Sequence, residues 1–113
     1  MNRIRVTLGG VVVTATLNDS NTARLLWSAL PFESTARRWG DEVYFQTPVD
    51  TGDENAQADV SAGAVAYWPS GKALCLFFGQ TPYSPVNVVG ELDGDPCALT
   101  ETQDGEMVRI EGA

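Results

Sequence analysis

The feature that most constrains the fold is a hairpin pattern near the N-terminus. Ile4, Val6 and Leu8 alternate with polar residues, which is the period-two signature of a half-buried strand. Gly9-Gly10 follows, and two glycines between such runs favour a tight turn because both accept a positive φ. The alternation then resumes over Val11–Leu17. These residues predict two antiparallel strands joined by a two-residue loop.

Further strand-like segments recur along the chain, each bounded by glycine, proline or acidic turn residues. They are Gly40–Thr47, Val60–Trp68, Ala73–Phe78, Asn87–Leu92 and Glu106–Glu111. The segment 73–78 is apolar throughout, as expected for a strand buried on both faces. Some seven short strands predict an all-β barrel or sandwich, and 113 residues fit a single domain.

One short helix interrupts the strands. Asn18 to Asn21 supply several N-cap candidates, and Ala23, Leu26 and Trp27 then recur at helical spacing. Pro31 ends the helix, since a residue before proline is disfavoured in the α region. We expect Leu26 and Trp27 to cover an open end of the sheet.

The charge balance restricts the partners. Fifteen acidic and seven basic residues give a formal net charge of −8, which repels nucleic acids and anionic membrane surfaces. No apolar run reaches membrane-spanning length, and the N-terminus lacks the apolar core of a signal peptide. With two cysteines in unlike contexts, Cys75 and Cys97, we expect a cytoplasmic protein with free thiols.

Motifs that suggest catalysis have simpler interpretations. Asp50-Thr51-Gly52 matches the signature of aspartic proteases, but Asp53 and Glu54 follow directly, where a paired-carboxylate site must be dry. We interpret 49–59 as a solvated acidic loop that also lacks calcium-loop spacing. Without histidine, no metal or other cofactor is expected, and Cys75 as a nucleophile would need an activating base.

Arg37-Arg38-Trp39 contains the only pair of adjacent basic residues. Two guanidinium groups beside an indole could clamp an anion, with the ring stacked on one of them. The alternative is that the arginines solvate a loop while the tryptophan packs.

Several longer segments resemble the small cyclophilin-like proteins of bacteria and archaea. They are Leu30–Ser34, Trp39–Phe45, Tyr67–Gly79, Thr81–Ser84 and Val86–Gly90, and the resemblance runs from about Ile4 to Ile110. It implies an all-β, closed, roughly eight-stranded cyclophilin-like barrel with one short helix capping an end. It also implies a groove on one outer face of the barrel.

The chain departs from active prolyl isomerases of that fold in two ways. The arginine that favours rotation about the prolyl bond falls at Phe45 or within one residue of it, and the chain has no histidine for the groove. A preorganised donor of that kind contributes about 3–4 kcal/mol to a reaction with a barrier of ~20 kcal/mol. We therefore expect a cyclophilin-like binding domain for a small molecule or short peptide, without conventional prolyl isomerase activity.

The resemblance implies a groove where aromatic and polar side chains meet. The candidate ligand-binding residues are Arg38, Glu42, Tyr44, Phe45, Trp68, Phe78, Tyr83 and Asn87. Apolar concave surfaces with a few polar groups are ordinary ligand sites.

Two other functions stay open. One is an isomerase or cyclase that uses the groove, with Glu42, Tyr44 or Arg38 as its polar groups, since a carboxylate among aromatic residues can act as an acid or base. The other is an accessory subunit of a larger enzyme complex, because related domains occur in allophanate hydrolase and oxoprolinase-type assemblies. A protein partner or a homodimer is compatible with either.

Overall fold

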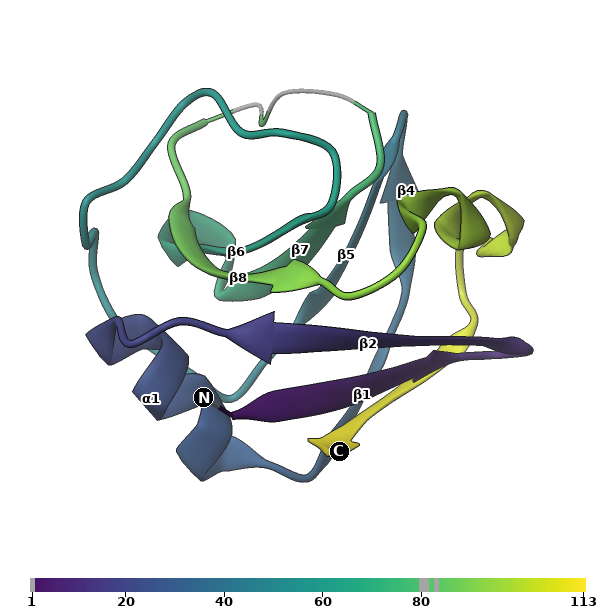
Figure 1. Ribbon diagram of the computed structural model, residues 1–113, viewed down its shortest axis with the longest axis horizontal. Helices are drawn as coiled ribbons and strands as arrows, with labels where there is room; N and C mark the ends of the chain where they lie inside the picture. Colours follow the sequence, from purple (N-terminus) through teal and green to yellow (C-terminus); the bar gives the residue numbers. More distant parts are fainter. Residues whose placement is uncertain (1, 80–81, 83) are drawn as a thin grey trace.

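A computed structural model describes residues 2–79, 82 and 84–113 of the chain (Figure 1). The described residues form nine strands, one α-helix and two short 3-10 helices. In chain order these are β1 (Arg3–Leu8), β2 (Val11–Leu17), α1 (Asn21–Ala29), β3 (Phe32–Thr35), β4 (Arg37–Trp39), β5 (Glu42–Gln46), β6 (Ala64–Trp68), η1 (Pro69–Gly71), β7 (Ala73–Phe77), β8 (Asn87–Leu92), η2 (Pro96–Glu101) and β9 (Met107–Gly112).

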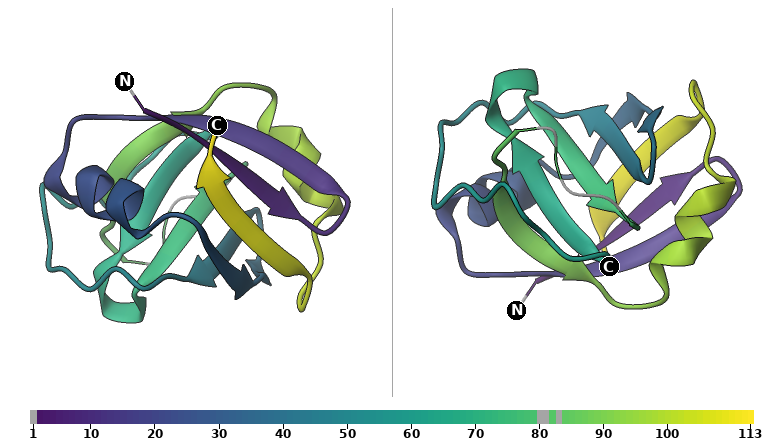
Figure 2. Two further views of the ribbon diagram at one scale, coloured as in Figure 1. Left: turned by 90° about the horizontal axis from the view of Figure 1, so that it is seen from below. Right: turned by 90° about the horizontal axis from the view of Figure 1, so that it is seen from above.

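The strands form one antiparallel sheet in the order β3-β9-β1-β2-β8-β6-β7-β5-β4. Its two outermost strands, β3 and β4, are separated only by Ala36, so both edges of the sheet lie on one continuous stretch of chain. The strands therefore wrap around a common interior (Figure 2). The predicted all-β cyclophilin-like barrel is confirmed, with nine strands instead of eight.

The N-terminal hairpin has the predicted form. Leu8 pairs with Val11, and Gly9 in the turn between them has a φ of +59°. The alternate residues Ile4, Val6 and Leu8 are fully buried in the barrel interior. They pack with the inward side chains of the other strands, among them Val43, Phe45, Val65, Tyr67, Leu74, Leu76, Val89, Val108 and Ile110.

The segment 32–39 was not predicted to be extended, yet it supplies β3 and β4. Its sequence has two adjacent arginines and little β-branched character, so local propensity is weak. Its strands exist because β9 and β5 offer unpaired edges. At the junction the N–H of Ala36 donates to the carbonyl of Glu106, and the N–H of Gly105 donates to the carbonyl of Ala36, both at 2.9 Å.

Turns shorten two predicted strands. Residues 40 and 41 form the turn between β4 and β5, so the strand predicted from Gly40 begins at Glu42. The strand predicted from Val60 begins at Ala64, because Gly63 adopts a φ of +95° in the turn before it. Asn87–Leu92 has the predicted bounds.

The helix α1 lies beside the start of β1 and the end of β2 (Figures 1 and 2). Ser20 is its N-cap, where the hydroxyl accepts a hydrogen bond from the N–H of Ala23 at 3.2 Å. Leu26 is buried in the core, whereas Trp27 is 37% exposed and its ring lies against Gly112 of β9. Among the described helices, none is long and apolar enough to cross a membrane.

The strand β7 is buried on both faces, as predicted from its unbroken apolar sequence. Leu74 and Leu76 point into the barrel core, whereas Cys75 and Phe77 belong to a second apolar cluster with Ala66 and Val86. This outer cluster covers β6 and β7 on the side away from the barrel interior. It forms the base on which the candidate site is built.

The close approach of β2 and β8 gives a test of the barrel. A Cβ added at Gly90 would collide with the carbonyl oxygen of Thr16 and with Cα of Leu17, both of which are backbone atoms. Because the backbone cannot yield without breaking the pairing, Gly90→Ala is expected to lower the free energy of unfolding by about 1–3 kcal/mol in urea denaturation.

Gly94→Ala is the matched control, since nothing lies within 4 Å of a Cβ added there. Equal stability of the two variants would contradict the packing of β2 against β8.

Candidate functional site

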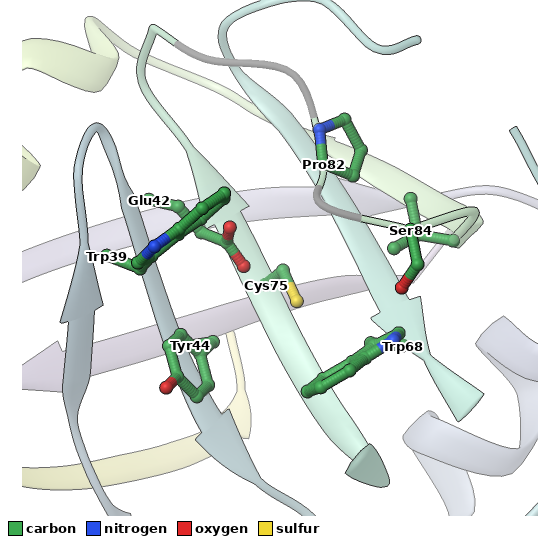
Figure 3. A pocket seen from close by; sticks show the side chains of 8 residues that line it. Trp39, Glu42, Tyr44, Trp68, Cys75, Pro82 and Ser84 are labelled. Carbon is green, nitrogen blue, oxygen red and sulfur yellow. The ribbon is translucent and has the colours of Figure 1, made fainter. Parts of the chain in front are cut away.

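A pocket of about 280 Å³ lies on the outer face of the barrel, over β5, β7 and β6 (Figure 3). Figure 3 shows Glu42 and Cys75 at its centre, Trp39 and Tyr44 on one side, and Trp68 on the other. Its lining residues are Trp39, Glu42, Tyr44, Trp68, Cys75, Pro82, Ser84 and Val86.

Strand register explains why these side chains meet. On β5, Val43 and Phe45 point into the core, so Glu42 and Tyr44 point outward. Tyr44 pairs with Cys75 of β7, and Cys75 pairs with Ala66 of β6. This row across the sheet therefore contains one large ring, that of Tyr44, followed by the small side chains of Cys75 and Ala66. Because these two side chains are small, a hollow remains beside the ring.

The ends of the neighbouring strands supply the other walls. Trp39 of β4 pairs with Glu42 and is 47% exposed. Trp68, the last residue of β6, stands against Gly71, because η1 turns the chain back over the indole ring. The pocket is therefore mostly aromatic and apolar, with one carboxyl group.

The carboxyl group of Glu42 is the electrostatic feature of the site. Glu42 is only 7% exposed, and this burial raises the pKa of its carboxyl, opposed by a hydrogen bond from the thiol of Cys75. Burial also holds the pKa of the Cys75 thiol well above its usual range, and the negative charge of Glu42 adds to that shift. Glu42 therefore keeps the thiol protonated instead of activating it as a nucleophile.

Three of the predicted ligand-binding residues, Glu42, Tyr44 and Trp68, line the pocket. Phe45 is fully buried in the barrel core, on the opposite face of β5. Phe78 packs at the edge of that core and does not line the pocket. Tyr83 lies outside the residues that the structure describes.

Arg38 holds the barrel end together and does not line the pocket. Its guanidinium donates to the carbonyls of Gly40, Thr100 and Thr102 at 2.8–3.1 Å. The guanidinium also stacks over the ring of Phe78, 5.0 Å from the ring centroid. The contacts with Thr100 and Thr102 fasten β4 to the end of η2 and to the residue that caps it.

Asn87 is buried and anchors the acidic loop. Its side-chain oxygen accepts from the N–H of Glu54 at 2.8 Å, and its NH₂ group donates to the carbonyl of Gly52 at 3.0 Å and to the hydroxyl of Thr22 at 3.1 Å. The carboxylate of Glu54 in turn accepts from the N–H groups of Asn21 and Thr22, at the start of α1. Hydrogen bonds from Thr22 and Asn21 lower the pKa of Glu54, which fits this capping role.

Five residues that line the pocket were not among the predicted ligand-binding residues: Trp39, Cys75, Pro82, Ser84 and Val86. Cys75 shares a face with Tyr44 only through the pairing of β5 with β7. Trp39 would have been found from its place next to the predicted strand. No feature of the sequence around Ser84 and Val86 indicated that these residues would line a pocket.

The acidic residues do not assemble a metal site. Among the described residues no group of three potential metal-ligating side chains comes together. Asp50 of the Asp-Thr-Gly sequence is exposed and forms an ion pair with Lys72 at 3.4 Å. Both cysteines are free thiols, Cys75 buried and Cys97 exposed.

Comparison with known proteins identifies the fold family. Residues 2–111 match the family model described as cyclophilin-like. The solution structure of the hypothetical protein AF2241 from Archaeoglobus fulgidus superposes with a TM-score of 0.86 at 39% identity, covering 99% of this chain and 95% of that one. No curated protein matches the chain.

A second solved structure, McbB in complex with tryptophan, superposes with a TM-score of 0.80 at 22% identity. It covers 96% of this chain but only 44% of McbB, and at this identity it shows a shared fold alone. The family match over nearly the whole chain and the nine-stranded barrel agree, and the chain belongs to the cyclophilin-like family.

Proposed function

We propose that the chain is a cyclophilin-like binding domain whose outer-face pocket takes a flat apolar group of a small molecule or short peptide. The observation that carries this proposal is the pocket itself. Cys75 lies at its centre, and the aromatic rings of Trp39, Tyr44 and Trp68 stand around it (Figure 3).

The spacing of the strands suits a ring. Tyr44 and Trp68 lie on β5 and β6, which flank β7, so two spacings of about 4.8 Å separate the strands, and Trp68 is also offset along β6 because it pairs with Ala73 and not with Cys75. A planar ring above Cys75 would have an aromatic side chain on either side. Aromatic contacts of this kind add about 0.5–1.5 kcal/mol to the burial of apolar area.

Tryptophan fluorescence tests the pocket directly. The chain has three tryptophans, of which Trp39 and Trp68 line the pocket and Trp27 lies on α1. In a Trp27→Phe background the emission reports on the pocket alone. Titration with the neutral probe 4-phenylbutyramide is expected to give a saturable change, and a saturating dose should raise the melting temperature, since a ligand at a hundred times its dissociation constant adds ~2.7 kcal/mol.

Trp68→Ala removes one wall and should weaken binding of the probe at least fivefold, whereas Trp27→Phe should bind like the parent protein. The absence of any saturable signal would exclude the pocket as a ring-binding site.

We also propose that the domain lacks conventional prolyl isomerase activity. Among the described residues that line the pocket there is no arginine, lysine or histidine. The guanidinium of Arg38 is committed to backbone carbonyls and to the ring of Phe78. A prolyl amide bound in the pocket would therefore meet no cationic side chain among the described lining residues.

In a protease-coupled assay on a proline tetrapeptide, the protein at micromolar concentration is expected to leave the rate of isomerisation within about twofold of the uncatalysed rate. An active cyclophilin measured in parallel provides the positive control. A rate comparable to that of the control enzyme would overturn the proposal.

A second candidate function is acid–base catalysis by Glu42. The observation that favours it is a carboxyl group that is 7% exposed, with a raised pKa, at the centre of a pocket. A group of this kind is costly to bury, which is typical of residues retained for activity.

The free-energy cost of burying the carboxyl of Glu42 depends on pH. Because folding raises the pKa of Glu42 above its unfolded value, the folded state binds the proton more tightly, and stability falls as the pH rises from the unfolded pKa through the folded one. Glu42→Gln removes this titration. The variant is expected to melt at a higher temperature than the parent protein at pH 7–8, and the difference should shrink towards pH 4.

Glu91→Gln, at an exposed position on β8, is the matched control for loss of one negative charge. An unchanged difference between Glu42→Gln and the parent protein from pH 4 to pH 8 would show that Glu42 does not titrate abnormally.

A further inference from the structure

A second cavity adjoins the pocket on the same outer face of the barrel. It has a volume of about 480 Å³ and is lined by Ser34, Thr35, Arg37, Tyr44 and Gln46. Tyr44 lines both hollows and is the residue that they share. The two hollows differ in chemical character, because the pocket is aromatic whereas the cavity has a guanidinium, two hydroxyl groups and an amide.

Arg37 is available to a ligand in a way that Arg3, Arg38, Lys72 and Arg109 are not. Arg3 pairs with Asp93, Lys72 with Asp50, and Arg109 with Glu33 and Glu111. Arg37 is exposed, and in the described part of the chain its guanidinium has no ion pair. Its cavity contains no acidic side chain among the described lining residues.

The register of three strands sets the distance between the two hollows. Arg37 of β4 pairs with Tyr44 of β5, and Tyr44 pairs with Cys75 of β7. These residues form one row across the sheet, in which β4 and β7 are two strand spacings, about 10 Å, apart. A ring above Cys75 and an anionic group beside Arg37 could therefore belong to one molecule, joined by a short chain that passes Tyr44.

We propose that the cavity at Arg37 is an anion subsite, and that the preferred ligand is an aromatic carboxylate whose ring occupies the pocket and whose carboxylate binds Arg37. The inference rests on the proposed function of the pocket and adds the chemical class of the ligand. Arg37 would supply a charge-assisted, two-pronged hydrogen bond, and the hydroxyl groups of Ser34 and Thr35 would complete the shell.

The carboxyl group of Glu42 does not face a ligand carboxylate bound at Arg37. Glu42 and Gln46 lie on either side of Tyr44 along the outer face of β5, Glu42 in the pocket and Gln46 in the cavity. A carboxylate bound at Arg37 would therefore meet an amide, with the phenol ring between it and the acid. Among the described residues that line the cavity, Arg37 is the only one with a charged side chain.

Three probes with the same ring and chain but different charge test the proposal. They are 4-phenylbutyrate, 4-phenylbutyramide and 4-phenylbutylamine, titrated in low salt and followed by tryptophan fluorescence and calorimetry. The anion is expected to bind about tenfold more tightly than the amide, and the amine more weakly than either. The advantage of the anion should decrease as salt is raised, because Arg37 is exposed.

Arg37→Gln should abolish the preference for the anion and leave the affinity for the amide unchanged. Arg5→Gln is the matched control, since Arg5 is an exposed arginine on β1, away from both hollows. It should retain the full preference.

The outcomes separate the two proposals. If all three probes bind equally, or if Arg37→Gln keeps the preference for the anion, the subsite is refuted and the pocket stands. If none of the probes binds, both proposals fail.

Discussion

The closure of the barrel through residues 32–39 is the constraint on which the rest of the structure depends. One stretch of chain pairs with β9 through β3 and with β5 through β4, and the buried Ala36 forms the junction. Without that double pairing the sheet would have two open edges and no enclosed interior. The same stretch places Trp39 in the pocket and Arg37 in the adjoining cavity, so the strand pairing that closes the barrel also positions these two residues.

The strand β7 has an equally central position, for a different reason. Its inward side chains fill the barrel, and its outward ones, Cys75 and Phe77, form a second apolar cluster with β6 and Val86. A small residue at position 75, between the ring of Tyr44 and Ala66, leaves a depression in this outer layer. The pocket thus exists because small side chains at this point leave space that larger side chains fill elsewhere on the outer face of β6 and β7.

Several buried polar side chains hold neighbouring segments together through hydrogen bonds, whereas the indole N–H of Trp68 and the hydroxyl of Thr102 are buried without a partner among the described residues. Asn87 is satisfied by the acidic loop and by Thr22, and through Glu54 it ties residues 49–59 to the start of α1. Arg38 satisfies three carbonyl groups at the end of the barrel. Glu42 differs, because burial of its carboxyl disfavours the charged form and the hydrogen bond it accepts comes from a weak thiol donor, Cys75. Among the described acidic residues, Glu42 is the one whose carboxyl pKa is raised.

The sequence by itself determined the local features: the Gly9-Gly10 hairpin, a polar N-cap among residues 18–21, the doubly buried strand that begins at Ala73 and the alternation that sets Glu42 and Tyr44 opposite Val43 and Phe45. Each follows from side-chain alternation or capping within a few residues. Only the tertiary structure decided that Phe45, Arg38 and Asn87 serve the scaffold, and that Cys75 and Trp39 line the pocket while Arg37 lines the adjoining cavity. Those assignments depend on which strands pair and in what register, and strand pairing is set by contacts between residues far apart in the chain.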